Sequence, residues 1–175
     1  LAKPAPAPGA RPPALRKVYV HTFGCQMNAS DSDRMVELLG RHSFARTDSA
    51  EDADLILLNT CAVREKAEQK LLSALGRYRE VKARRGALIA VSGCVAQQEK
   101  DRLLARVPYV DFGFGPDNIG KLPEMVARAA RERFAETGWM DSHDYVFPQA
   151  DPEAARGRPT AFVTAMKGCD NVCAF

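Results

Sequence analysis

The stretch LILLNTC, residues 55–61, is a short apolar run that ends in a cysteine. Its apolar residues are consecutive rather than alternating, which is typical of a β-strand buried on both faces of a sheet. Two other stretches have the same form, VYVHTFGC at residues 18–25 and LIAVSGC at residues 88–94. A polar segment that begins a helical pattern follows each cysteine. This repetition predicts parallel strands that are joined by helices.

Five strands and four helices are expected along the chain. The strands lie near residues 17–23, 43–47, 54–59, 87–92 and 109–114. The helix after the first strand is expected to take Ser30 and Asp33 as its capping pair. The other helices lie near residues 63–85, 96–106 and 121–135, with Gly86 ending the first of them and Pro123 in the first turn of the last.

This alternation predicts an α/β fold with a doubly wound, mostly parallel, five-stranded sheet. Ligands of such sheets bind outside the carboxyl ends of the strands. In the flavodoxin-like strand order 2-1-3-4-5, the strands before Cys25, Cys61 and Cys94 are neighbours, about 4.8 Å apart. In the other common order, 3-2-1-4-5-6, strand two separates strands one and three. A shared site for the three cysteines therefore requires the flavodoxin-like order.

The composition changes twice along the chain, which predicts four regions. Residues 1–16 hold five of the eleven prolines and are expected to be a disordered tail. The sheet domain occupies residues 17–135, and residues 136–158 lose periodicity and are expected to form a linker. Residues 159–175 contain a new strand, AFVTAMK, and are expected to begin another domain. Since the chain starts with Leu rather than Met and stops inside a motif, we expect it to be a piece of a longer protein.

The composition indicates in which cellular compartment the protein works and how its cysteines are used. The net charge of +3 neither requires nor excludes a nucleic-acid partner. No apolar run reaches the length of a membrane span, and no secretory signal pattern opens the chain. We therefore expect a cytoplasmic protein whose thiols stay reduced. Five widely spaced cysteines fit metal ligation better than a disulfide framework.

The first three cysteines share one position in the β/α unit. A single free cysteine is often only a small buried apolar residue. Cys25, Cys61 and Cys94 all stand at the rim where such sheets bind ligands, which favours a common site. Structural zinc usually takes four ligands with close local pairs. Three isolated thiolates with an open fourth position are better suited to a 4Fe–4S cluster that has one exposed iron.

The last two cysteines are close together in the segment GCDNVCAF, residues 168–175. Cys169 and Cys173 are either incidental cysteines of a tail or part of a cluster motif. One more cysteine at the next position would complete C-x3-C-x2-C, the radical S-adenosylmethionine signature, in which an aromatic residue such as Phe175 often precedes the third cysteine. The strand before Cys169 and the three-cysteine domain favour the second interpretation.

The chain resembles the radical S-adenosylmethionine methylthiotransferases, and most closely their tRNA branch (MiaB type). The resemblance covers about residues 17–175 and rests on TFGCQMN (22–28), NTCAVRE (59–65), SGCVAQ (92–97), FGPDNIGKLPEM (114–125) and MKGCDNVCAF (166–175). Gln26 and Met27 favour the tRNA branch, because the ribosomal-protein branch tends to have Pro-Lys or Ala-Lys there. The threonylcarbamoyl-adenosine branch tends to have Lys-Val.

The resemblance implies two 4Fe–4S clusters in the full protein. Cys25, Cys61 and Cys94 would bind the auxiliary cluster, which carries or supplies sulfur. Cys169 and Cys173 would bind the cluster that holds S-adenosylmethionine, with the third ligand beyond the end of this chain. A 5′-deoxyadenosyl radical would take hydrogen from carbon 2 of the isopentenyl-adenosine at position 37, next to the tRNA anticodon. Sulfur and a methyl group, the latter from a second S-adenosylmethionine, would then be added there.

The resemblance also implies partners and a limit on activity. The partners would be tRNA, through its anticodon loop, and an electron donor such as flavodoxin or ferredoxin, with no membrane association and a monomeric state. The third radical-cluster cysteine, most of a radical S-adenosylmethionine barrel and a C-terminal RNA-binding domain are not present in these residues. We therefore expect this polypeptide alone to bind the auxiliary cluster at most and to be inactive.

Several alternatives remain open at this stage. The protein is either a tRNA methylthiotransferase, a methylthiotransferase acting on a ribosomal-protein aspartate, or a non-enzymatic flavodoxin-like module that holds zinc or a structural cluster. Gln26 and Asn28 could hydrogen-bond to cluster sulfide or substrate, and Asn28 could equally be a helix cap. Trp139 either packs between domains or stacks on a base. The basic residues near the end of helix 63–85 form either a solvated face or an RNA contact: Arg77, Arg79, Lys82, Arg84 and Arg85.

Overall fold

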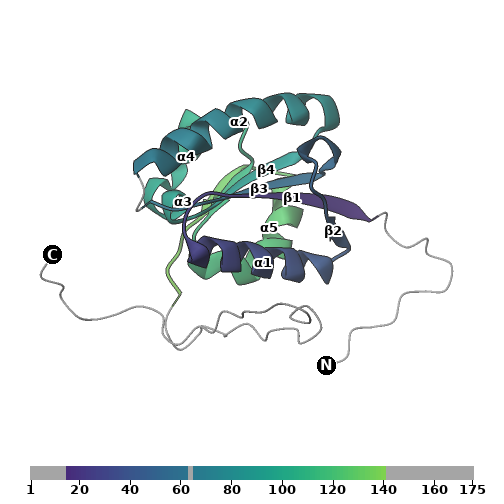
Figure 1. Cartoon of the computed structure of the whole chain (residues 1–175), viewed down its shortest axis with the longest axis horizontal. Helices are drawn as coiled ribbons and strands as arrows, with labels where there is room; N and C mark the ends of the chain where they lie inside the picture. Colours follow the sequence, from purple (N-terminus) through teal and green to yellow (C-terminus); the bar gives the residue numbers. More distant parts are fainter. Residues whose placement is uncertain (1–14, 63–64, 141–175) are drawn as a thin grey trace, which may run out of the picture. The chain divides into compact units, whose positions relative to one another are not determined.

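Six parallel strands form one sheet in the order β2-β1-β3-β4-β5-β6 (Figure 1). A computed structural model describes residues 15–62 and 65–140, all within one compact unit. The strands are β1 Arg16–Thr22, β2 Phe44–Arg46, β3 Leu55–Thr60, β4 Leu88–Gly93, β5 Phe112–Phe114 and β6 Phe134–Glu136. The predicted flavodoxin-like order of the first five strands is confirmed. Most of the predicted tail, most of the linker, the strand near 161–167 and Cys169 and Cys173 lie outside the described residues. The end of the predicted tail is wrong by one residue, because Arg16 already belongs to β1.

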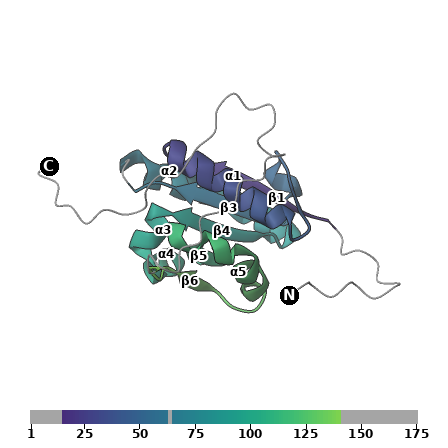
Figure 2. The same cartoon turned by 90° about the horizontal axis from the view of Figure 1, so that it is seen from below.

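Helices cover both faces of the sheet, as a doubly wound fold requires. On one face lie α1 Gln26–Gly40 and α5 Leu122–Ala129, which Figure 2 views from their own side. On the other face lie α2 Glu65–Arg85, α3 Cys94–Glu99 and α4 Asp101–Arg106 (Figure 1). Two short 3-10 helices, Ala50–Asp52 and Pro116–Lys121, complete the connections. Among the described residues, no helix has the length and apolar character needed to cross a bilayer.

The core consists of one apolar cluster on each face of the sheet, and β3 contributes to both. Ile56 and Leu58 pack in the cluster beneath α2, α3 and α4, whereas Leu55 and Leu57 pack in the cluster beneath α1 and α5. All six residues of β3 are buried, which explains why this strand has no alternation of apolar and polar residues. The unbroken apolar run thus indicated its central place in the sheet.

Near the end of the described region, pairing between β5 and β6 changes the predicted helix and strand boundaries. The last helix was expected to reach residue 135, but α5 ends at Ala129. Phe134–Glu136 instead forms β6, which pairs with β5 in register from Phe112 to Phe114. A three-residue strand is too short to show its own periodicity, so its existence depends on the partner strand. Strand β5 itself begins at Phe112 rather than at Tyr109.

Two expectations about helices were also wrong. The helix near 96–106 is divided into α3 and α4 at Lys100, whose positive φ of 51° is incompatible with a continuing right-handed helix. Ser30 and Asp33 do not cap α1, because that helix begins at Gln26 with Cys25 as its N-cap residue. Asp33 instead forms an ion pair with Arg46, with 3.5 Å between the charged atoms.

Candidate metal centre

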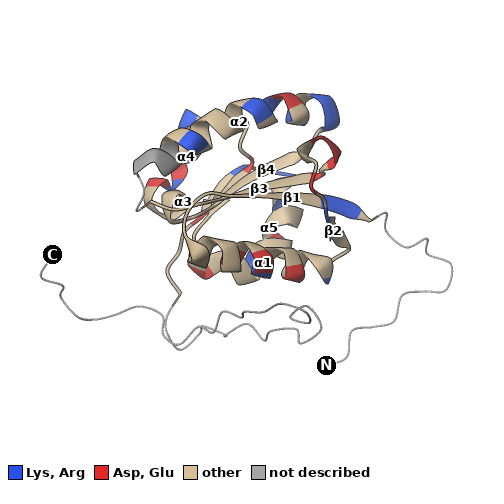
Figure 3. Ribbon diagram, viewed as in Figure 1, with Lys and Arg blue, Asp and Glu red and all other residues tan. Residues whose placement is uncertain are grey.

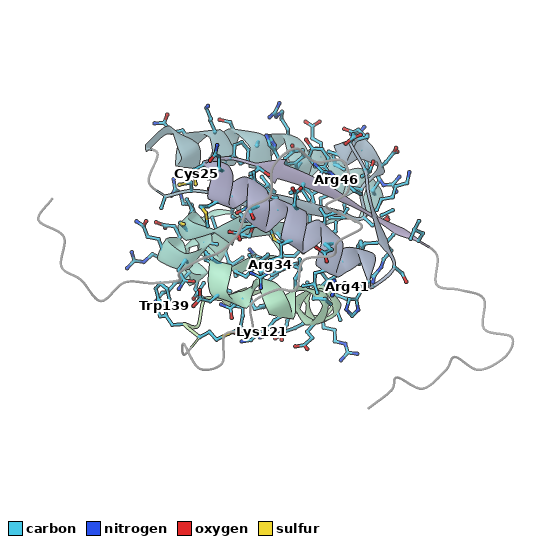
Figure 4. All side chains as sticks on the ribbon, turned by 60° about the horizontal axis from the view of Figure 1, so that its bottom comes forward. Cys25, Arg34, Arg41, Arg46, Lys121 and Trp139 are labelled. Atoms are coloured by element: carbon cyan, nitrogen blue, oxygen red, sulfur yellow. The ribbon has the colours of Figure 1, made fainter. Side chains whose placement is uncertain are left out.

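The three cysteines follow three adjacent strands at the same edge of the sheet. Cys61 directly follows β3, Cys94 directly follows β4, and Cys25 comes three residues after the end of β1. Thr60 is paired with Gly93, so Cys61 and Cys94 each stand one residue beyond a paired position. Figure 4 shows Cys25 at the first turn of α1. The predicted grouping of the three loops at one rim is therefore present.

Two glycines allow these loops to lie against one another. Gly24 has a φ of +140°, and a Cβ atom there would lie 2.7 Å from the Cβ of Cys61. Gly93 has a φ of +91°, and a Cβ atom there would lie 2.1 Å from the carbonyl oxygen of Thr60. Residues with side chains rarely adopt such backbone angles, and no room exists for a side chain. The glycine before each outer cysteine thus brings its loop into contact with the end of β3.

A hydrogen-bonded network joins the ends of β1 and β3 to the first turns of α1. Asn59 Nδ2 donates to the carbonyl oxygen of Asn28 at 2.8 Å and to Ser32 Oγ at 3.0 Å. Asn28 Nδ2 donates to the carbonyl oxygen of Thr60 at 3.2 Å. The hydroxyls of Thr22 and Ser32 lie 2.8 Å apart. Because buried amides are costly to leave unpaired, this network holds the starts of the cysteine loops in one arrangement.

Asn28 has a structural role that favours one of its two predicted interpretations. Its Oδ1 accepts a hydrogen bond from the backbone N–H of Cys25 at 3.2 Å and lies 3.4 Å from Cys25 Sγ. Its side chain is buried, with only 4% of the residue exposed. Asn28 is therefore part of the cap of α1, where it ties the helix start to Cys25. Gln26 is exposed on the same turn.

The polar ends of the strands were a signal that the sequence prediction did not use. Thr22, Asn59 and Ser92 each stand two or three residues before a cysteine, and they are aligned with one another in the sheet register. A polar residue at the end of an otherwise apolar strand, repeated three times, could have revealed the network. Ser92 Oγ is buried and has no hydrogen-bond partner among the described residues.

The thiols differ in their exposure and do not surround a single ion. Cys61 is 5% exposed, whereas Cys25 and Cys94 are exposed. Within residues 15–62 and 65–140, no group of three or more His, Cys, Asp or Glu is arranged to hold one metal ion. The ligands of a cubane cluster bind different irons and stand farther apart than the ligands of one ion. The structure thus brings the three loops together, and the cluster itself stays a prediction.

The residues at the rim fit a thiolate-bound group. The three side chains are all soft thiol donors, which favour iron–sulfur centres over hard cations. Cys25 lies at the N-terminus of the fifteen-residue α1, where the helix dipole stabilises a negative charge. The unsatisfied hydroxyl of Ser92, two residues before Cys94, is a spare donor for an acceptor such as cluster sulfide.

Four of the predicted basic residues of α2 contact side chains outside the helix. Lys82 pairs with Asp111, Arg84 pairs with Glu51, and the charged atoms of Arg85 and Asp54 lie 3.5 Å apart. The guanidinium of Arg79 lies 5.9 Å from the centre of the Tyr109 ring. Figure 3 shows the basic residues along this helix.

These contacts link the C-terminal part of α2 to the rest of the fold. Of the five predicted basic residues, only Arg77 has no such ion pair or ring contact among the described residues.

His21 of β1, which is partly buried, contacts Tyr78 of α2, which is buried. His21 Nδ1 lies 2.7 Å from the Tyr78 hydroxyl, which is in turn 3.4 Å from the Tyr19 hydroxyl. Burial, and then the positive charge of Arg77, lower the pKa of His21 below its ordinary value of 6.5. Burial, and then the hydrogen bond with Tyr19, raise the pKa of Tyr78. The fold therefore favours a neutral imidazole at His21.

This shift predicts that the fold becomes less stable in mild acid. As the pH falls below 6.5, the unfolded chain takes up a proton at His21 before the folded chain does. The free energy of unfolding should therefore decrease from pH 6.5 downward until the lower pKa of the folded state is passed. Urea denaturation over a pH series measures this slope, and His21→Gln should make it shallower. His42→Gln, at an exposed position, is the control and should keep the slope of the unchanged chain.

Trp139 lies on the segment after β6 and is 78% exposed (Figure 4). Asn118 Nδ2 donates to the carbonyl oxygen of Gly138 at 2.9 Å, and the N–H of Met140 donates to Asp117 Oδ2 at 3.2 Å. These bonds hold the backbone on both sides of Trp139. Its predicted packing between domains or stacking on a base therefore stays a prediction, with an exposed indole that is available for either.

Comparison with known proteins gives one family match. Residues 17–115 match the family described as "Uncharacterized protein family UPF0004". The matched segment contains Cys25, Cys61 and Cys94 together with all but the first residue of β1, and with β3, β4 and the helices that follow these strands.

Curated relatives match nearly the whole chain. A protein of Anaeromyxobacter sp. (strain Fw109-5), named tRNA-2-methylthio-N(6)-dimethylallyladenosine synthase, is 92% identical over 99% of this chain. Proteins of the same name from Myxococcus xanthus and Ruegeria pomeroyi are 63% and 46% identical over 92% and 91% of the chain. The chain spans 38%, 35% and 37% of the lengths of these three relatives.

Proposed function

The chain belongs to the UPF0004 family, and from this we propose that it is the N-terminal, auxiliary-cluster part of a tRNA methylthiotransferase. The observation that carries the proposal is the position of Cys25, Cys61 and Cys94 after three adjacent parallel strands. The names of the relatives, at up to 92% identity, support tRNA rather than a ribosomal protein as the substrate. Gln26 and Met27 favour the same branch.

In this proposal, the three rim cysteines hold the auxiliary 4Fe–4S cluster. Cys169 and Cys173 supply two ligands of a second 4Fe–4S cluster, which binds S-adenosylmethionine. When bound, these groups supply the sulfur, the methyl group and the radical that convert N6-isopentenyladenosine at position 37 into its 2-methylthio derivative. A flavodoxin or ferredoxin would supply electrons.

The chain's own residues hold the cluster ligands in place. The turns at Gly24 and Gly93 set the outer cysteine loops against the end of β3. Asn28 and Asn59 fix the backbone beneath them. This arrangement leaves Cys25 and Cys94 exposed, so a group bound there has an open side toward substrate. An open iron position at that side suits sulfur delivery better than a closed structural site.

Anaerobic reconstitution with iron and sulfide tests the proposal. We expect about four irons and about four sulfides per chain, with the spectrum of one cubane cluster in Mössbauer spectroscopy. The 175-residue polypeptide should form no methylthiolated tRNA, because it contains two of the three thiolates of the radical-cluster motif. Zinc bound in equal amount to protein, without sulfide, would contradict the auxiliary cluster. Product formation by this polypeptide would contradict the assigned division of roles.

A further inference from the structure

Three aromatic rings lie along the second half of β1 and just beyond it, on the face of the sheet that carries α2. Tyr19 and His21 belong to β1, and Phe23 follows its last residue. All three lie on the side of α2, because Tyr19 and Phe23 pack against the cluster beneath that helix and His21 contacts Tyr78. The rings of His21 and Phe23 are 4.0 Å apart between centroids, and those of Tyr19 and Tyr78 are 5.8 Å apart. Helix α2 packs mainly on β3 and β4, which leaves His21 and Phe23 partly exposed beside it.

An open hollow of about 440 Å³ lies over the rings of His21 and Phe23. Its size is within the range of pockets for small ligands. Aromatic side chains at the end of β1 and just after it, and polar or basic side chains of α2, line it: His21, Phe23, Gln69, Lys70, Ser73 and Arg77. The hollow therefore combines two aromatic rings, tilted by 31° to one another, with hydrogen-bond donors and two cations from α2.

The two cations of the hollow differ from Lys82, Arg84 and Arg85 at the C-terminal end of α2. Lys82, Arg84 and Arg85 each have a carboxylate partner, whereas none of the described carboxylates pairs with Lys70 or Arg77. Lys70 and Arg77 are seven residues apart, so they project from the same side of the helix, about 10 Å apart along its axis. Long basic side chains at that spacing can reach two successive phosphates of an extended strand.

The hollow also lies close to the cysteine rim. Phe23 is two residues before Cys25, and its N–H donates to the carbonyl oxygen of Asn59 at 2.7 Å, at the carboxyl end of the sheet. The lowered pKa of His21 keeps its ring neutral beside Arg77, which suits stacking and avoids repulsion between two cations. Rings that stack on bases, next to cations that bind phosphates, are the means by which proteins hold single-stranded nucleic acid.

We infer that this hollow binds one unpaired nucleotide of the RNA substrate, with its base on Phe23 and His21 and its flanking phosphates on Lys70 and Arg77. The inference rests on the proposed function, which supplies RNA as the substrate. It adds a contact that would hold the RNA beside the rim of Cys25, Cys61 and Cys94. A nucleotide bound there would place a neighbouring base of the same loop near the exposed thiols.

RNA-binding measurements on charge-reversal variants test the inference. The probe is a fluorescent anticodon stem–loop RNA, and its Kd for the reconstituted chain is measured by anisotropy at several salt concentrations. Arg77→Glu should weaken binding about 10-fold and should lower the slope of log K against log salt by about 0.7, the value for one contact with a single strand. Arg84→Glu changes the net charge equally at the far end of α2 and should leave Kd within about 2-fold.

A second variant tests the aromatic wall. Phe23→Ala should weaken binding by about 5- to 100-fold with the salt slope unchanged, because stacking rather than charge is lost. If Phe23→Ala disturbs the fold, the double variant Lys70→Glu, Arg77→Glu on the exposed helix face still decides the question. Equal weakening by Arg77→Glu and Arg84→Glu would overturn the inference, since only the general charge of the surface would then matter.

Iron content, measured for the same samples, separates this inference from the proposed function. Weaker RNA binding by the Arg77→Glu and Phe23→Ala variants, at normal iron content, supports both the nucleotide-binding hollow and the auxiliary-cluster assignment. Unchanged RNA binding by these variants at normal iron content overturns the inference that the hollow binds a nucleotide, and leaves the auxiliary-cluster assignment intact. Failure of the unchanged chain to assemble a cluster, with the predicted changes in Kd still present, overturns the auxiliary-cluster assignment and leaves the hollow standing.

Discussion

Replacing Cys61 with alanine is expected to abolish stable binding of the auxiliary iron–sulfur cluster. Cys61 is the central member of the three, because it follows β3, which lies between β1 and β4 in the sheet. Its removal leaves Cys25 and Cys94 on two strands that are not neighbours, and two thiolates do not hold a cubane. Iron and sulfide content after anaerobic reconstitution should fall to near zero, because Cys169 and Cys173 are also only two thiolates. The absorbance of the sulfur-to-iron charge-transfer band should fall with them.

The fold should survive this change, so that the loss can be assigned to ligation. Removing one buried sulfur atom costs about 1 kcal/mol, which is small beside the usual stability of a domain. The thermal unfolding midpoint of the variant without cluster should therefore stay close to that of the apo chain. Met27→Ala is a matched control, because Met27 is 58% exposed on the turn beside Cys25 and carries sulfur without a thiol. An unchanged charge-transfer band in Cys61→Ala would refute the ligand assignment.

The sequence was sufficient for the central part of the fold because those strands are marked by their burial. The run LILL of β3 and the repeated position of Cys25, Cys61 and Cys94 predict both the parallel sheet and the adjacency of the three strands. The elements at the edge could not be predicted in the same way. Strand β6 has three residues, Phe134–Glu136, and exists only because β5 offers its free edge.

The sequence predicts where the candidate site lies in the sheet, but not the conformation of its loops. The rim rule for parallel sheets locates the cysteines after the strands, without reference to their loops. The conformation of those loops depends on positive φ angles at Gly24 and Gly93 and on the side-chain bonds of Asn28. A sequence pattern does not state which residues those bonds join. For this reason the sequence predicts Ser30 and Asp33 as the capping pair, although Cys25 and Asn28 cap α1.

The hollow over His21 and Phe23 was missed for a related reason. The alternation of Tyr19, His21 and Phe23 is visible in the sequence, but it is equally typical of a strand that is covered by a helix. Only the position of α2 over β3 and β4 shows that this part of β1 is left partly open. The sequence instead suggested an RNA contact at the basic C-terminal end of α2. Lys82, Arg84 and Arg85 of that end are paired with carboxylates within the fold.

Gly93→Ala is expected to destabilise the fold by about 3–5 kcal/mol. A side chain at a φ of +91° costs energy by itself, and its Cβ would stand 2.1 Å from the carbonyl oxygen of Thr60. Backbone atoms cannot give way as the end of a flexible side chain can, so β3 and β4 must separate at this point. Urea denaturation of the apo chain measures the loss. A value of this size is a large fraction of the stability of an ordinary domain.

Gly76→Ala provides the opposite result in the same measurement. Gly76 lies inside α2 on an exposed position, and a Cβ atom there meets nothing within 4 Å. Alanine should therefore stabilise the chain by about 0.5–1 kcal/mol, through its better helix propensity. Equal stability of the two variants would show that the close contact between Gly93 and Thr60 does not exist in solution.

The same substitution at Gly93 should also reduce cluster binding under conditions where the chain is still folded. Separation of the strand ends moves Thr60, and with it Cys61, away from Cys94, because each cysteine directly follows one of the two residues in contact. Iron content should therefore fall well before the fraction of folded chain does as the temperature is raised. Iron loss that follows unfolding at every temperature would mean that the turn at Gly93 stabilises the sheet without setting the distance between the two ligands.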